Sequence, residues 1–85
     1  MLETGSIVRS KAGRDKECFL AVTGVKGDEI LVCDGKHRPL ERPKKKNPKH
    51  LQLTNSVLSQ EQMRGNKALK KALWEFSRKG DSVNA

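Results

Sequence analysis

Aromatic side chains are scarce in this chain of 85 residues, which has two phenylalanines, one tryptophan and no tyrosine. Modules that bind single-stranded nucleic acids usually stack the bases on several exposed aromatic rings. With only Phe19, Trp74 and Phe76, the chain has few rings to offer. Any contact with a nucleic acid is therefore expected to involve mainly its phosphates and its folded shape.

Long apolar runs, a disulfide framework and a catalytic motif are also missing from the sequence. The longest apolar stretch is only a few residues, so neither a membrane span nor a signal peptide is expected. The two cysteines, Cys18 and Cys33, suit a cytoplasmic protein with reduced thiols. No Ser/His/Asp arrangement, phosphate loop or pair of carboxylates in an apolar context is present, so an enzyme is not expected.

A zinc site is disfavoured by the spacing of its possible ligands. Cys18, Cys33, His37 and His50 would supply four ligands, but the two cysteines are too far apart in the sequence to form a ligand pair. Both cysteines also fall in predicted strands or at their ends, where cysteine acts as a small apolar residue. We expect neither a metal nor another cofactor.

Positive charge is concentrated in one short segment. The net charge is +8, but residues 1–35 hold five Lys/Arg against six Asp/Glu. Residues 36–50 hold seven Lys/Arg and one acid, and residues 51–85 hold six and three. Such a distribution is typical of a surface that faces a polyanion.

Alternating apolar residues and turn signals predict a mainly β fold of five short strands. The third and fourth strands are expected to pair across a tight Asp34-Gly35 turn, and Gly27-Asp28 to form an earlier turn. Pro43 and Pro48 remove backbone donors, and the lysines between them repel each other, so residues 42–49 are predicted to be an exposed, extended basic loop. The predicted strands are 6–10, 17–23, 29–33, 36–40 and 50–54, the last with Leu51 and Leu53 pointing inward.

The pattern changes to a helical period after residue 55. Ser59 and Gln62 have the spacing of a capping box, which predicts a short helix that ends at Gly65-Asn66. A second helix is predicted from Asn66 to about Lys79. Its apolar stripe either packs on the sheet or docks on a partner; a small sheet gains from an apolar cover. The stripe consists of Leu69, Ala72, Leu73 and Phe76. Residues 1–57 are thus expected to form one unit and residues 58–85 a helical extension.

Three motifs occur in an order that resembles the KOW domain. These are the segments SKAGRDK at 10–16, VCDG at 32–35 and PKKKNPKHL at 43–51. The first has a central glycine between two predicted strands, as in the KOW motif. The match covers roughly residues 4–55 and is similar to short bacterial KOW-domain RNA-binding proteins, which in turn resemble a small KOW protein of the archaeal and eukaryotic large ribosomal subunit.

The resemblance implies a small five-stranded SH3-like barrel with a C-terminal helical extension that binds structured RNA. It implies ribosomal RNA as the partner, possible contact with ribosomal proteins, and a monomer when unbound. Gly13 would let the backbone approach phosphates, while basic residues of two connections supply charge. The remaining candidate RNA-binding residues are Arg9, Lys11, Arg14, Lys16, Lys44, Lys45, Lys46, Lys49 and His50.

Two other functions remain open at this point. SH3-like barrels of the transcription and translation machinery also dock proteins, so the chain could be a protein-interaction module. It could also bind nucleic acids in general, in which case duplex DNA would bind as tightly as RNA at matched salt. Both basic connections could instead be solvated surface loops.

Overall fold

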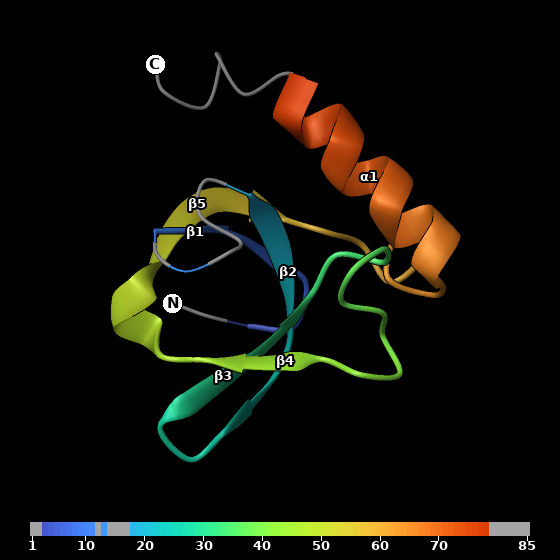
Figure 1. Cartoon of the computed structure of the whole chain (residues 1–85). Coiled ribbons are helices and arrows are strands. Elements are labelled where there is room, and N and C mark those ends of the chain that lie inside the picture. The colour runs from blue at the N-terminus through green and yellow to red at the C-terminus, as the bar shows by residue number, and fades with distance from the viewer. Residues whose placement is uncertain (1–2, 12, 14–17, 79–85) are drawn as a thin grey trace.

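The computed structural model describes residues 3–11, 13 and 18–78. Within these residues, an antiparallel sheet has the strand order β4-β3-β2-β1-β5, and an α-helix covers part of one face (Figure 1). A short 3-10 helix connects the two edge strands. The elements are β1 (Ser6–Ser10), β2 (Phe19–Lys26), β3 (Glu29–Cys33), β4 (Lys44–Lys46), the 3-10 helix (Pro48–His50), β5 (Leu51–Val57) and α1 (Asn66–Arg78).

Alternation along the strands creates one apolar cluster on each face of the sheet. Ile7 pairs with Ala21 and belongs to the cluster under α1, whereas the next pair, Val8 with Leu20, belongs to the cluster on the opposite face. The opposite cluster contains Val8, Leu20, Val22, Ile30, Val32 and Leu51. The cluster under α1 contains Ile7, Ala21, Cys33, Leu58, Leu69, Ala72 and Leu73.

The sheet curls strongly, so that its β4 edge returns toward β1. The Nζ atom of Lys46 on β4 donates a hydrogen bond of 2.7 Å to Oγ of Ser10 on β1. Two strands separate β4 from β1 in the sheet, so this bond requires the sheet to bend back on itself. Within the described ranges no strand pairing joins β4 to β5, and the structure therefore shows a curled sheet rather than a closed barrel.

Two predictions for the fourth strand are wrong. Residues 36–40 form bends and a turn, and β4 lies instead at Lys44–Lys46, inside the segment predicted to be a loop. The two prolines flank β4 without interrupting it, so its three residues can pair with β3. Asp34 folds the connection locally, because its Oδ1 accepts hydrogen bonds from the backbone N–H groups of Lys36 and Arg38, each at 2.8 Å.

The remaining strands differ from the prediction mainly at their ends. β1 and β3 have the predicted bounds, whereas β2 continues to Lys26 and β5 continues to Val57. The turn at Gly27-Asp28 has the expected positive φ, 61° at Gly27. Leu51 is buried as predicted, but Leu53, on the same edge strand β5, is 45% exposed, so its predicted inward orientation is wrong.

The apolar stripe of α1 packs on the sheet, in agreement with one of the two alternatives. Leu69, Ala72 and Leu73 are buried, and Phe76 contacts the ring of Phe19 edge-on at a centroid distance of 5.0 Å. The capping box also forms, with reciprocal bonds between Ser59 and Gln62, but it closes a turn instead of a helix. Nowhere in the described ranges is a helix long and apolar enough to span a membrane.

Candidate nucleic-acid interface

The β1–β2 connection starts where β1 meets the end of the 3-10 helix. The backbone N–H of Lys11 donates a hydrogen bond of 2.7 Å to the carbonyl oxygen of His50. Immediately before it, Ser10 pairs with Leu51 in the register of β1 and β5. These contacts join the first predicted basic connection to the second, although about forty residues separate them in the sequence.

Lys46 lies beneath this junction. Its side chain is 7% exposed, and its ammonium is bonded to Ser10 within the fold. A Cβ atom placed on Gly13 would lie 3.8 Å from Nζ of Lys46, so the glycine of the KOW-like motif lies directly beside this ammonium. A buried ammonium requires hydrogen-bond partners, and Lys46 therefore ties β4 to β1 inside the fold.

The pairing of β4 with β3 explains why the three consecutive lysines differ in exposure. Lys46 pairs with Ile30 and Lys44 with Val32, so both lie on the face of the second apolar cluster. Their aliphatic stems can cover apolar residues there. Lys45 lies on the other face and is exposed. The alternation thus divides one run of identical charges into an outward and two inward side chains.

Asn47 orders the segment that follows β4. Its Oδ1 accepts a hydrogen bond of 2.9 Å from the backbone N–H of Lys49, and its carbonyl oxygen accepts one of 2.9 Å from His50. Pro48 occupies the first turn of the 3-10 helix, where a missing N–H costs little. The sequence analysis included neither Asn47 nor Ser10 among the site residues. The dipeptide Asn47-Pro48 is a capping and turn signal that could have indicated the first of them.

Of the predicted residues that the structure describes, it brings Lys11 to His50 and Gly13 to Lys46. Lys11, Lys45, Lys49 and His50 are exposed, as is Gly13, whose φ is 82°. Arg9 and Lys44 are half-buried, and Lys46 is buried. Arg14 and Lys16 lie outside the described residues.

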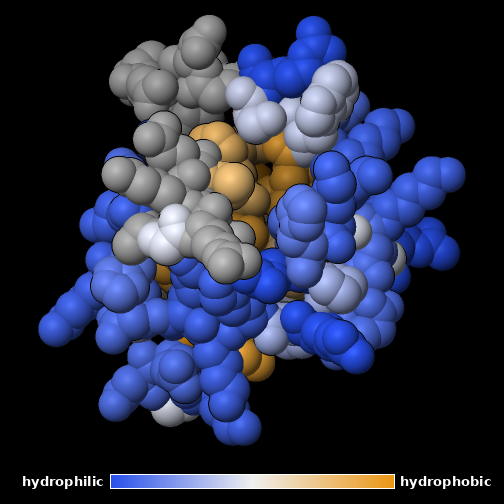
Figure 2. Space-filling view, viewed as in Figure 1, coloured by the Kyte–Doolittle hydropathy of each residue, from blue (hydrophilic) through white to orange (hydrophobic). Residues whose placement is uncertain are grey.

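This edge of the sheet can bind anions by charge and by hydrogen bonding. Lys11 and Lys49 supply ammonium groups, and His50 adds an imidazole at the same junction, while Lys45 adds an exposed ammonium on the outer face of β4. Hydrogen bonds already order the backbone that carries these cations, so little backbone freedom would be lost when the cations neutralise phosphates. Figure 2 shows that hydrophilic residues cover most of one face of the molecule, while apolar residues are visible between β2 and α1.

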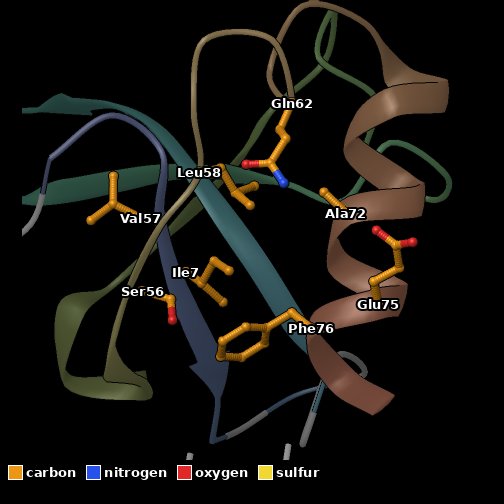
Figure 3. Close-up of a pocket in the computed structure, with 8 residues that line it drawn as sticks. All are labelled: Ile7, Ser56, Val57, Leu58, Gln62, Ala72, Glu75 and Phe76. Carbon is orange, nitrogen blue, oxygen red and sulfur yellow. The ribbon is translucent and has the colours of Figure 1, made fainter. Parts of the chain in front are cut away.

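A hollow lies between α1 and the β1–β5 side of the sheet (Figure 3). Its volume is about 240 Å³. The only charged group in its lining is the carboxylate of Glu75, which would repel a phosphate. This hollow is therefore no part of the basic interface. The lining residues are Ile7, Ser56, Val57, Leu58, Gln62, Ala72, Glu75 and Phe76.

The two cysteines differ in their exposure. Cys18 is exposed and Cys33 is buried, and both are free thiols. Burial raises the pKa of the Cys33 thiol from 9.0 to about 11, with smaller contributions from the negative charges of Asp34 and Glu41. In the part of the chain that the structure describes, no three His, Cys, Asp or Glu side chains are grouped as metal ligands would be.

Comparison with known proteins gives no assignment: no protein-family model matches this chain, and no curated protein matches it either.

Proposed function

We propose that this protein binds structured RNA through the edge of the sheet at which its two basic connections meet. The observation that carries the proposal is the pair of contacts joining them, from Lys11 to the His50 carbonyl and from Lys46 to Ser10. Two unrelated solvated loops would not need to be bonded to each other. Bonded together, they hold several cations at one place, as binding to a phosphate backbone requires.

The curled sheet supports a KOW-type, SH3-like barrel as the scaffold of this function. The strands β1 to β4 follow one another as antiparallel neighbours, and β5 then returns to pair with β1. The Lys46–Ser10 bond brings the β4 edge to β1, as barrel-like curvature requires. In this proposal the exposed Gly13 carries the backbone close to a phosphate oxygen.

The choice of RNA, and of ribosomal RNA in particular, rests on the resemblance to KOW-domain proteins. The charge distribution supports a polyanion independently of that resemblance. The interface residues include no Phe, Tyr or Trp, which favours a folded RNA recognised by its backbone over an unpaired strand at this edge. Cytoplasmic ribosomes, or their precursors, would then be the site of action.

Titration of a fluorescently labelled hairpin of large-subunit ribosomal RNA tests the proposal. The logarithm of the association constant should fall linearly with that of the salt concentration between about 50 mM and about 200 mM. A DNA hairpin of the same sequence should bind more weakly at each salt concentration. Equal binding of both hairpins would identify a general nucleic-acid-binding protein instead.

Paired variants assign the binding to the interface. Replacing Lys45 and Lys49 by alanine should weaken RNA binding on the order of tenfold and reduce the slope of the salt dependence by about two. The matched control replaces Lys26 and Lys67, two exposed lysines outside the interface, and removes the same charge. Equal losses in both double variants would show that net charge, and not this edge, accounts for binding.

Sedimentation of cell extract tests the ribosomal assignment separately. The protein should travel with ribosomal particles at low salt and leave them at high salt, because its contacts are ionic. RNA crosslinked to it in the low-salt fractions should map to ribosomal RNA. Absence from every ribosomal fraction at low salt would contradict the ribosomal assignment even if RNA binding is observed.

A further inference from the structure

The single tryptophan of the chain is exposed on α1 and surrounded by cations. Trp74 is 57% exposed, and it lies off the stripe that packs on the sheet. Lys70 and Lys71 precede it by four and three residues, so all three share one side of the helix. Arg78 follows by four residues, and its guanidinium carbon lies 4.9 Å from the centroid of the Trp74 ring.

A lysine from a different part of the chain completes this group. Lys36, in the connection between β3 and β4, lines a hollow of about 330 Å³ together with Lys70, Lys71 and Trp74. Three lysines and one tryptophan line the hollow, and no acidic residue does. None of these residues belongs to the basic interface described above.

The backbone holds Lys36 against the helix. Gly35 has a φ of 81°, and a Cβ atom there would collide with the carbonyl of Asn66 and lie 3.0 Å from the backbone nitrogen of Lys70. The connection therefore approaches the first turn of α1 as closely as a glycine permits. Asp34 fixes the same turn by accepting a hydrogen bond of 2.8 Å from the backbone N–H of Lys36.

Asn66 adds a second attachment between the connection and the helix. Its Oδ1 accepts a hydrogen bond of 2.7 Å from the backbone N–H of Leu40, and its Nδ2 donates to both carboxylate oxygens of Glu41, at 2.8 and 3.1 Å. The hydrogen bond from Asn66 lowers the pKa of the Glu41 carboxyl. The connection that carries Lys36 is thus held beside α1 by the close approach at Gly35 and by the side-chain hydrogen bonds of Asn66.

We propose that this hollow binds an unpaired nucleotide of the RNA, with the base stacked on Trp74 and the phosphates held by the lysines; the inference rests on the proposed RNA-binding function. Trp74 presents its indole ring at the surface beside three lysines, and every nucleobase has a face that can stack on such a ring. Lys36, Lys70 and Lys71 lie around the ring, where the sugar-phosphate chain of a stacked nucleotide would pass.

The chemistry of the hollow also indicates how selective it is. Stacking and ammonium–phosphate contacts do not depend on the hydrogen-bonding edge of the base, so the site should accept any base and favour the larger purines. Arg78 rests on the indole and extends the cationic surface beside it. A folded RNA with a nucleotide flipped out of a loop or bulge could then contact the basic interface and this hollow.

Because Trp74 is the only tryptophan, its fluorescence reports directly on this site. The full chain is titrated with a single-stranded adenylate oligonucleotide of about eight nucleotides, a length typical of one binding site. Stacking should quench the emission in a saturable way. Sodium polyphosphate of similar charge should compete at the lysines without comparable quenching, and equal quenching by polyphosphate would overturn the stacking model of the site.

Substitutions at Trp74 separate stacking from charge. Trp74→Leu should weaken oligonucleotide binding on the order of tenfold, measured by anisotropy of a labelled strand, whereas Trp74→Phe should retain most of it. Replacing Lys70 and Lys71 by alanine should lower the salt slope by about 1.4, or about 0.7 for each lysine. Unchanged oligonucleotide affinity in Trp74→Leu would overturn the proposal.

The same titrations distinguish failure of this inference from failure of the proposed function. Hairpin RNA should bind Trp74→Leu with unchanged salt dependence, because the basic interface is intact. If the hairpin binds but the oligonucleotide does not quench Trp74, the hollow is not a nucleotide site, while the proposed function stands. If the oligonucleotide quenches but the hairpin does not bind, the nucleotide site stands and binding of structured RNA is contradicted.

Discussion

At the scale of single residues, Lys46 and Lys45 show how neighbouring lysines acquire different roles. Lys45 is exposed and available to a phosphate, whereas Lys46 is buried and bonded to Ser10. The ammonium of Lys46 stabilises the junction of the two connections from within. We therefore infer that Lys46 positions the interface, and that Lys45 makes contact with RNA.

Substitution of Lys46 by methionine tests this difference. Methionine keeps an unbranched apolar stem of similar length but removes the ammonium and its hydrogen bond to Ser10, so the free energy of unfolding should fall by about 1–3 kcal/mol. The slope of the salt dependence of RNA binding should stay the same, while Lys45→Ala lowers it by about one. A slope reduced equally by both substitutions would show that Lys46 reaches a phosphate after all.

The buried thiol of Cys33 predicts a loss of stability at alkaline pH. Its pKa is about 11 in the folded chain against 9.0 when exposed, so the unfolded state releases the proton first. The contribution of this thiol is fully present below pH 9 and is lost as the pH rises from 9 to about 11, by about 2 kcal/mol. Urea unfolding of the native chain and of Cys33→Ala should show a shallower alkaline decline in the variant. Parallel declines would contradict the assignment to Cys33.

At the scale of elements, most strands and the helix could be predicted because their signals are local. The alternation of apolar and polar residues predicted β1 and β3, and the helical spacing of apolar residues predicted α1. β4 could not be predicted in the same way, since Lys44–Lys46 has neither alternation nor β-branched residues. Its strand conformation depends on pairing with β3, which overrides the repulsion between its lysines.

The candidate site could be predicted only as a set of charges. The sequence indicates which segments are basic, but the burial of Lys46 follows from the register of β4 with β3. Lys36 and Trp74 come together because Gly35 allows a distant connection to pack on α1. Such contacts between remote segments have no signature in a local pattern.

Two glycines with positive φ provide a test of that packing. Gly35→Ala should destabilise the fold by about 3 kcal/mol, because it adds a collision with Asn66 to the strain of a left-handed backbone. Gly27→Ala is the matched control, since its φ is 61° and no atom would lie within 4 Å of the new methyl group. It should cost only about 1 kcal/mol. Urea denaturation measures both, and similar losses would argue against close packing at Gly35.

At the scale of the whole molecule, the sheet separates two apolar clusters that together stabilise one fold. Leu20 is fully buried in the cluster away from α1, and Leu69 is fully buried in the cluster beneath it. Adjacent residues of β1 and of β2 contribute their side chains to different clusters. The helix is thus expected to unfold together with the sheet, and not as a separate appendage.

Leucine-to-alanine substitutions on the two faces test this cooperativity. Leu20→Ala and Leu69→Ala should each destabilise the protein by about 3 kcal/mol, because each leaves a cavity in a buried cluster. Both should lower the midpoint of one transition that circular dichroism and Trp74 fluorescence report identically. Lys67→Ala, on the exposed side of α1, should change stability by less than about 0.5 kcal/mol. A helix that melts before the sheet in Leu69→Ala would contradict a single unit.

The hydrogen bond from Lys11 to His50 makes recognition depend on the complete fold. The unfolded chain carries the same charges, but only the folded chain holds them at one place where a nucleic acid can contact several of them together. A nucleic acid bound across this hydrogen bond would hold the two connections together and so stabilise the folded state. The bound nucleic acid should therefore raise the melting temperature of the protein with the logarithm of its free concentration, and added salt should reduce this increase.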